Sequence, residues 1–279
     1  MLRRFAISIA AAAALAPGAL AALPATASAD MVVSSNWAGY AVTGAKYRKV
    51  SARWVEPKGN CKEGRPSYAS AWVGLGGFTE RSPGLEQTGT DLICTRKGRA
   101  RHAAWYELIP APSRPIRMRI SGGDVMSASV TVRRKKVTIL LRNQTTGGTF
   151  RKKLKMKHPG IDSAEWVVEA PSGCTWDGDC QILPLSDFGA TPFSRAKATT
   201  RGGRTGTISS WRRSKIILSE GPYGYGASAV PTGLAAGGSA FEVAYRTDGP
   251  WADGSSSAKR VFPTSRVARP PSPHIHLRP

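Results

Sequence analysis

The sequence predicts an all-β fold, an antiparallel sandwich or barrel, and two observations lead to that prediction. From Ser34 onwards, short segments rich in β-branched and aromatic residues alternate with clusters of Gly, Pro, Asn and Ser. No stretch carries a sustained helical period of apolar residues. Short strands separated by frequent turn signals are typical of β-sandwiches and β-barrels, whose consecutive strands pair antiparallel.

The predicted strands follow one another along the middle of the chain. The clearest span residues 50–57, 67–75, 102–109, 125–132, 136–143, 164–170 and 215–219. The basic run at residues 133–136 separates two of them, and we interpret it as a hairpin turn that places its charges in solvent. Residues 221–238 are rich in small side chains and predict a long loop at the border of a cleft.

The two ends of the chain differ in composition from the strand-rich part. Residues 1–29 join two arginines to an alanine-rich apolar run and small residues at Ala27 and Ala29, which predicts a signal peptide cut after Ala29. The alternative, a membrane-spanning helix, is disfavoured by Pro17. Residues 30–248 are predicted to form the folded domain and 249–279 a flexible basic tail. We therefore expect a secreted protein, monomeric and free of the membrane after cleavage.

The charge balance is strongly basic. Lys and Arg number 40 against 18 Asp and Glu, a formal net charge of +22. Such a surface attracts polyanions, and anionic cell-wall polymers are the partners that an exported chain would meet. A specific nucleic-acid partner is not expected, because no nucleic-acid-binding motif and no basic helix with interleaved aromatic residues accompanies the charge.

Four cysteines in an exported chain suggest two disulfides. Cys174 and Cys180 flank a turn-rich segment and are expected to close a short loop, which leaves Cys61 and Cys94 to pair across a longer one. Zinc binding is the alternative, but neither a C-x-x-C motif nor a histidine pair at ligand spacing accompanies the cysteines. We therefore expect neither metal nor cofactor.

The familiar catalytic motifs of hydrolases are absent. The sequence has no G-x-S-x-G, no H-E-x-x-H, no Asp-Thr-Gly and no phosphate-binding glycine loop. His102 is the first residue of a predicted strand, and a histidine at that position is more often a strand-edge residue than a catalytic base. What remains is a set of acids and amides on strands beside tryptophans: Trp72, Gln87, Asp91, Trp105, Glu107, Glu165, Trp166 and Glu169. Strand alternation puts Trp105 with Glu107, Gln87 with Asp91 and Glu165 with Glu169 on shared faces.

Five ordered motifs, SSNWAGYAV (34–42), AWVGLGG (71–77), LEQTG (85–89), AWYELIP (104–110) and AEWVVEAP (164–171), resemble those of the glutamic peptidases called eqolisins. The resemblance extends more weakly through residues 178–193 to 241–245. It implies a β-sandwich of two bent antiparallel sheets whose concave face forms the substrate groove, and a catalytic pair of Gln87 and Glu169. It also places Trp72 near that pair and Glu107 and Trp37 further along the groove. With Trp105 and Asp91, these residues form the expected substrate-binding set.

The chemistry of peptide hydrolysis explains why a glutamine would accompany a glutamate. The reaction needs a base for the water, a donor for the oxyanion and an acid for the leaving amine. Glu169 can serve as base and then as acid, while the neutral Gln87 amide can both donate and accept. A carboxylate base with a pKa near ~4.3 works best in acid, and the resemblance implies a pepstatin-insensitive endopeptidase that cleaves proteins. Two alternatives stay open: a glycoside hydrolase using Glu107 and Glu169, and a non-catalytic sandwich that binds cell-wall polyanions.

Overall fold

The computed structural model describes residues 29–174, 180–219 and 227–247, and almost every element in them is a β-strand. The strands are β1 Asp30–Ser34, β2 Trp37–Thr43, β3 Tyr47–Val55, β4 Ser67–Gly76, β5 Leu85–Cys94, β6 Ala100–Ile109, β7 Arg114–Ile116, β8 Val125–Arg133, β9 Lys136–Asn143, β10 Thr149–Lys155, β11 Ala164–Glu169, β12 Ser172–Cys174, β13 Cys180–Ile182, β14 Ala190–Thr200, β15 Thr205–Gly206, β16 Arg212–Ser219, β17 Ser228–Pro231 and β18 Phe241–Arg246. Two short 3-10 helices span Ile208–Ser210 and Ala236–Gly238. The predicted all-β fold is confirmed.

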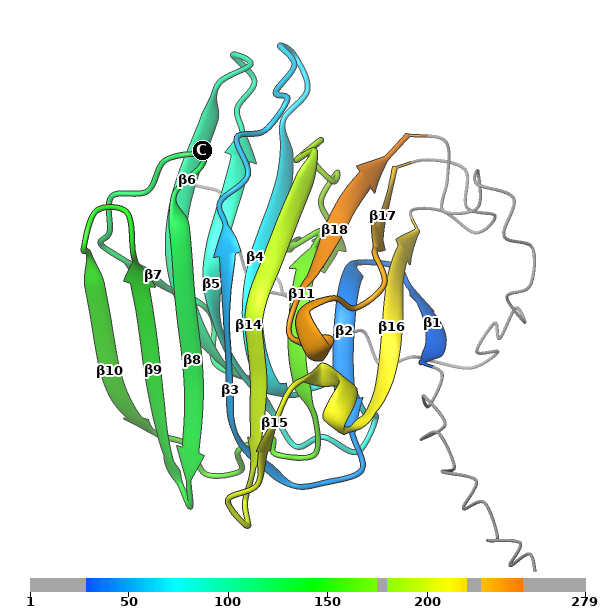
Figure 1. The fold of residues 1–279 in the computed structure, drawn as a ribbon. Coiled ribbons are helices and arrows are strands. Elements are labelled where there is room, and N and C mark those ends of the chain that lie inside the picture. The colour runs from blue at the N-terminus through cyan, green and yellow to red at the C-terminus, as the bar shows by residue number, and fades with distance from the viewer. Residues whose placement is uncertain (1–28, 175–179, 220–226, 248–279) are drawn as a thin grey trace, which may run out of the picture.

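The long strands form one folded sheet that packs on itself as two layers. Its order is β10-β9-β8-β3-β14-β18-β17-β16-β2-β11-β4-β5-β6-β7, with mainly antiparallel neighbours. The first five strands make a front layer of curved strands, and β4, β5, β6 and β11 lie behind it in a back layer (Figure 1). At the open side, Tyr106 of β6 stacks on Phe150 of β10 with ring centroids 5.7 Å apart, which brings the two ends of the folded sheet together.

The space between the layers holds the main hydrophobic core. In β3 from Val50 onwards, and throughout β8 and β9, every second side chain is buried, as expected of strands with one face on a core and one in solvent. The core side chains from the front layer, such as Trp54 and Ile139, meet Trp166 and Val73 from the back layer. Fully burying an aliphatic or aromatic side chain of this kind contributes roughly 1.5–3 kcal/mol, so this layer-on-layer packing is the main source of stability.

Both predicted disulfides are present. Cys61 is bonded to Cys94 across 33 residues and so ties the loop after β3 to the end of β5, while Cys174 is bonded to Cys180 between β12 and β13. In the chain-entropy model the longer loop alone contributes about 3–4 kcal/mol to stability.

The predicted strands agree with the observed ones, and the basic run folds as the β8–β9 hairpin with Arg133 paired to Lys136. The prediction of one long loop over residues 221–238 was wrong, because β17 and the second 3-10 helix lie within it. Pairing of β17 with β16 and β18 overrides the weak local strand preference of small residues.

The predicted signal peptide, apart from Ala29, and the predicted tail fall outside the described residues, so these boundaries stay predictions. Within the described residues, no helix has the length and apolarity needed to cross a membrane.

Candidate active site

One face of the back layer, which we call the site face, brings together the side chains that the sequence singled out, except Trp166, which lies in the main core. Along β4, Ser70 pairs with both Glu169 and Asp91, and Gly74 pairs with Gln87. Gln87 in turn pairs with Glu107 on β6. Because directly paired residues point to the same side of a sheet, the site face carries Trp37, Trp72, Gln87, Asp91, Trp105, Glu107 and Glu169.

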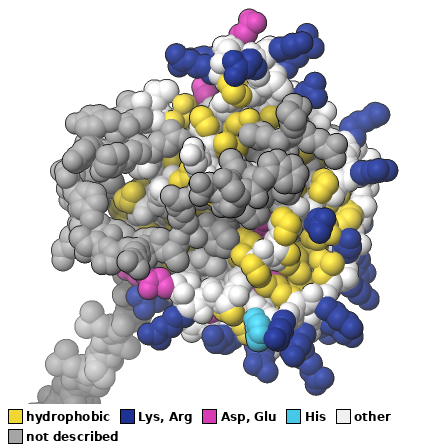
Figure 2. Space-filling model, turned by 180° about the vertical axis from the view of Figure 1, so that it is seen from behind, with side chains coloured by type: hydrophobic (Ala, Val, Ile, Leu, Met, Phe, Trp, Pro, Cys, Tyr) yellow, Lys and Arg dark blue, Asp and Glu magenta, His cyan; other side chains and the backbone are white. Residues whose placement is uncertain are grey.

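The site face points away from the main core, yet its polar side chains are fully buried. Gln87, Glu107 and Glu169 all have an exposed fraction of 0%. A second hydrophobic cluster surrounds them on this face, made of the site-face tryptophans together with Ala41, Leu85, Ile109, Val167 and Ile216, with Phe78 packed against it. Seen from behind, hydrophobic side chains gather on part of the surface and Lys and Arg side chains surround them (Figure 2). The acids therefore lie in an apolar environment where their interactions are strong.

Two N–H donors hold the Glu169 carboxylate, one on each oxygen. Asn36 Nδ2 donates to Glu169 Oε1 at 3.0 Å, and Trp72 Nε1 donates to Glu169 Oε2 at 2.7 Å. These two donors favour the ionised form of the carboxyl, because hydrogen bonds to an ionised acceptor are stronger than those to a neutral one. Asn36 was not singled out from the sequence as a site residue, although it lies in the SSNWAGYAV motif directly before the buried strand that begins at Trp37.

Glu107 fixes the amide of Gln87. Gln87 Nε2 donates to Glu107 Oε2 at 2.7 Å, and within the described residues the buried Gln87 Oε1 has no hydrogen-bond partner. The Glu107 oxygen accepts this bond, so its position sets which end of the amide faces it. The second N–H of the amide and its carbonyl oxygen remain for a ligand.

Trp72 lies between the glutamine and the glutamate. It follows Ser70 and precedes Gly74 on the site face of β4, and its ring meets Trp37 edge-on with centroids 4.9 Å apart. The adjacent Gly89 makes room for it: a Cβ there would lie 2.5 Å from Trp72 Cβ and 2.3 Å from Ala71 O. A glycine is therefore required beside this tryptophan.

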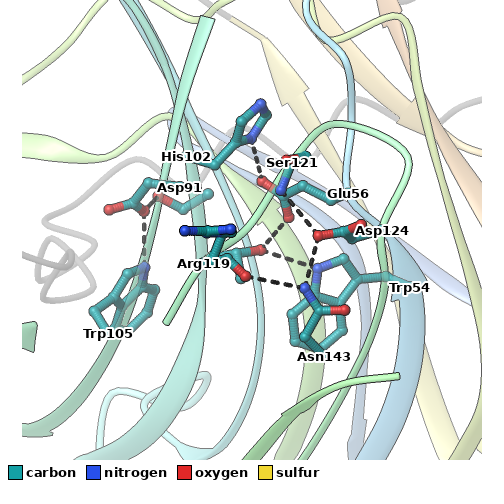
Figure 3. A network of polar contacts seen from close by, with 11 residues as sticks. Trp54, Glu56, Asp91, His102, Trp105, Arg119, Ser121, Asp124 and Asn143 are labelled. Atoms are coloured by element: carbon teal, nitrogen blue, oxygen red, sulfur yellow. Dashed lines mark hydrogen bonds and ion pairs between the residues drawn. The ribbon is translucent and has the colours of Figure 1, made fainter. Parts of the chain in front are cut away.

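Asp91 extends the site face beyond Trp72, and the Trp105 ring points toward its carboxyl group (Figure 3). Ser70 Oγ and Trp105 Nε1 both donate to Asp91 Oδ1, at 2.6 and 2.7 Å. Burial raises the pKa of Asp91 from 3.8 to about 7, an effect that the two hydrogen bonds reduce and the nearby Glu56 charge increases. In acid the Asp91 carboxyl is therefore protonated and can both donate and accept.

The remaining buried acids have other surroundings. Glu165 lies on the site face four residues before Glu169, and burial raises its pKa well above the ordinary value. Glu86 points to the opposite face, where its Oε1 accepts a hydrogen bond from Gly160 N at 2.7 Å. Burial also raises the pKa of Glu86 well above the ordinary value. The predicted alternation thus separates Gln87 from the acid next to it in sequence.

His102 belongs to the reverse of the site face. Its Nδ1 lies 2.8 Å from Glu56 Oε1, and Glu56 Oε2 accepts from Thr90, whose hydroxyl also accepts from Trp54 Nε1 (Figure 3). His102 pairs with Leu92, whereas Asp91 pairs with Ala103. The imidazole therefore lies away from Gln87 and Glu169. Among the described residues, no group of three or more His, Cys, Asp or Glu side chains is arranged to hold a metal ion.

Comparison with known proteins decides what this arrangement belongs to. Residues 35–223 match the Peptidase A4 family. The chain belongs to the Peptidase A4 family. It is 31% identical over 196 residues to Aspergillopepsin-2 of Aspergillus niger, a match that covers 62% of this chain and 67% of that protein. The family resemblance stated from the sequence is confirmed, and this family member is a glutamic endopeptidase that acts on peptide bonds.

Solved structures agree with this fold. A complex of scytalido-glutamic peptidase with a transition state analog inhibitor superposes with a TM-score of 0.66 at 24% identity, covering 76% of this chain and 98% of that one. The aspergilloglutamic peptidase from Aspergillus niger gives a TM-score of 0.51 at 29% identity, covering 64% and 99%. The two-layer sandwich is thus the architecture of solved glutamic peptidases.

Proposed function

We propose that this Peptidase A4 member hydrolyses peptide bonds with Glu169 as general base and then acid, and with Gln87 as the amide that stabilises the oxyanion and orients water. One observation carries the proposal: both side chains are fully buried on the same sheet face, and each is held by a hydrogen bond, Glu169 from Trp72 and Gln87 to Glu107. Fixed polar groups in an apolar site need no reorganisation during the reaction, which is the condition for electrostatic catalysis.

The surroundings of Glu169 suit a base that must keep one orientation. Asn36 and Trp72 each donate to a different oxygen of its carboxylate. A water that is hydrogen-bonded to the carboxylate loses a proton to it as the water oxygen attacks the peptide carbonyl carbon. The proton then passes from Glu169 to the departing amine nitrogen, which restores the carboxylate.

The surroundings of Gln87 suit an oxyanion donor. Glu107 engages one N–H of its amide, so the other N–H can donate to the oxygen that becomes negative in the tetrahedral intermediate. Removing a single donor of this kind typically costs ~2.7–4 kcal/mol of barrier. The same contact argues against the glycosidase alternative, in which Glu107 would have to meet the sugar as acid or nucleophile.

The substrate chain is expected to lie across the site face beside the tryptophans. Trp37 Nε1 is buried and, in the described part of the protein, has no hydrogen-bond partner. It can therefore donate to a peptide carbonyl, while Trp105 and the protonated Asp91 border the next position along the sheet. A carboxylate base works best near its own pKa, so the role of Glu169 implies an acidic pH range for activity. The two disulfides fit an oxidising, extracellular location.

The test is cleavage of a denatured protein from pH 2 to 7 by the native enzyme and its Glu169→Gln variant, with fragments identified by mass spectrometry. Pepstatin and a neutral polysaccharide substrate are included in parallel. We expect pepstatin-resistant cleavage in acid that is lost in the variant, and no sugar release. Equal cleavage by both proteins would overturn the assignment of Glu169, and sugar release without peptide cleavage would overturn the reaction.

A further inference from the structure

The outward face of the front layer, which we call the cationic face, carries many basic side chains and no acid. Its basic members are Lys49 and Arg53 on β3, Arg133 on β8, Lys136 and Arg142 on β9, Arg151, Lys153 and Lys155 on β10, and Lys197 on β14. The five strands β3, β8, β9, β10 and β14 contain no Asp or Glu at all. The cations therefore share one continuous sheet surface.

None of these cations forms an ion pair within the described residues. The basic side chain that points inward behaves differently, because Lys152 Nζ donates to Tyr106 OH at 2.9 Å and lies 5.2 Å from the ring centroid. Like charges on one face repel one another and raise a strong positive potential over it. Such a surface is suited to an extended partner of opposite charge.

Hydroxyl groups occupy the middle of the cationic face. The cross-strand rows place Ser51, Ser127, Ser129, Thr131 and Thr138 between the basic side chains. Strands lie about 4.8 Å apart and outward side chains repeat about every 6.7 Å along a strand, so cations and hydroxyls alternate at close spacing. A chain that carries both hydroxyls and acidic groups would find a partner for each kind.

Aromatic side chains are missing from these outward positions, because Tyr47 and Trp54 of β3 are buried and β8 and β9 contain no aromatic residue. Proteins that bind single-stranded nucleic acids rely on aromatic platforms for base stacking, and base reading in a duplex needs an element that enters a groove. A slightly curved sheet of cations and hydroxyls offers neither. The chemistry of the face thus favours a sugar polymer over a nucleic acid.

We propose that the cationic face binds an extended anionic polysaccharide and holds the peptidase on it. The cationic face belongs to the front layer and the site face to the back layer (Figure 1). Each is the side of its layer that points away from the main core between the layers. A polymer bound to the cationic face therefore does not contact the candidate active site. The inference is independent of the catalytic roles given to Glu169 and Gln87.

The test is binding of fluorescently labelled polygalacturonate to the full mature chain at pH 5.5, by anisotropy, at several NaCl concentrations. The test variant combines Arg142→Gln, Arg151→Gln and Lys153→Gln, all at exposed positions. The matched control combines Arg96→Gln, Lys97→Gln and Arg99→Gln in the exposed β5–β6 turn, which removes the same charge elsewhere. Cooperative thermal unfolding of both variants establishes that they fold.

We expect the test variant to bind polygalacturonate at least about tenfold more weakly at low salt and with a shallower salt dependence, because fewer counterions are exchanged. The control should stay within about threefold of the native protein. Equal weakening in both variants would attribute binding to net charge and overturn the cationic face as the site. Absence of binding by the native protein, or tighter binding of an oligothymidine of equal charge, would overturn the polysaccharide as partner.

Discussion

Side chains alternate between the two faces of the strands in both layers of the sandwich, but the two layers differ in how many of their faces are buried. In the front layer, β3, β8 and β9 bury one face and leave basic and hydroxyl side chains exposed on the other. In the back layer, β4, β5 and β11 are buried on both faces. A polar side chain on a front strand is therefore solvated, whereas one on a back strand needs a hydrogen-bond partner. The difference indicates that catalytic side chains in this fold belong on the back layer, where polar groups are buried and held by hydrogen bonds.

The same contrast appears within a single strand of the back layer. On β5, Gln87 and Asp91 face the tryptophans of the site face, while Glu86 and Thr90 face Gly160 and Glu56 on the reverse. Consecutive residues thus divide between a structural and a candidate catalytic role. Three substitutions on the site face, at Asp91, Trp72 and Gln87, would sharpen or break this division.

The largest expected effect is a dependence of stability on pH that comes from Asp91. Its pKa rises from 3.8 in the unfolded chain to about 7 in the fold, so the folded protein retains a proton that the unfolded chain releases. The contribution is fully present below pH ~4 and is lost as the pH rises through 7, on the order of 4 kcal/mol for this group alone. Chemical denaturation from pH 3 to 8 measures it.

Asp91→Asn is the matched variant for this pH dependence, because the amide oxygen can still accept from Ser70 and Trp105. We expect its unfolding free energy to fall less between pH 4 and 7 than that of the native protein. Part of the decrease should persist, since the pKa values of Glu86 and Glu165 are raised as well. Identical pH profiles for the two proteins would contradict the assignment to Asp91.

A smaller effect is expected from Trp72→Phe, which keeps an aromatic ring and removes the donor to Glu169 Oε2. Hydrogen bonds to charged groups contribute about 1.5–3 kcal/mol, so kcat/KM should fall by roughly tenfold to a hundredfold. Trp54→Phe is the control, since it loses a similar bond to Thr90 on the reverse face. An equal loss of activity in both variants would mean that the two faces are not functionally distinct.

Much of this division could be predicted from the sequence. The alternation of β-branched and polar residues gives most strands, and residue parity assigns Trp105 with Glu107 and Gln87 with Asp91 to shared faces. Which strands become neighbours was harder to predict, because pairing of β11 with β4 joins segments nearly a hundred residues apart in sequence. The ordered motifs that resemble those of the eqolisins indicated instead that these two segments belong to one site.

Other features could not be predicted because they depend on three-dimensional neighbours. The contact of Asn36 with Glu169 spans 133 positions of sequence, and no local pattern indicates it. The small-residue strand β17 is set by its neighbours β16 and β18 rather than by its own composition. The cationic face likewise requires the order of β10, β9, β8, β3 and β14, since the basic residues lie far apart along the chain.

The central claim is that a neutral amide in the buried acidic face stabilises the transition state, and kinetics of Gln87→Ala test it most directly. The measurement is kcat and KM for a peptide substrate in acid, with Gln144→Ala on the exposed turn after β9 as control. We predict a fall of about 10²–10³ in kcat with little change in KM, as for other single oxyanion donors, and near-native kinetics for the control. Activity of Gln87→Ala within a few-fold of the native enzyme would contradict the account.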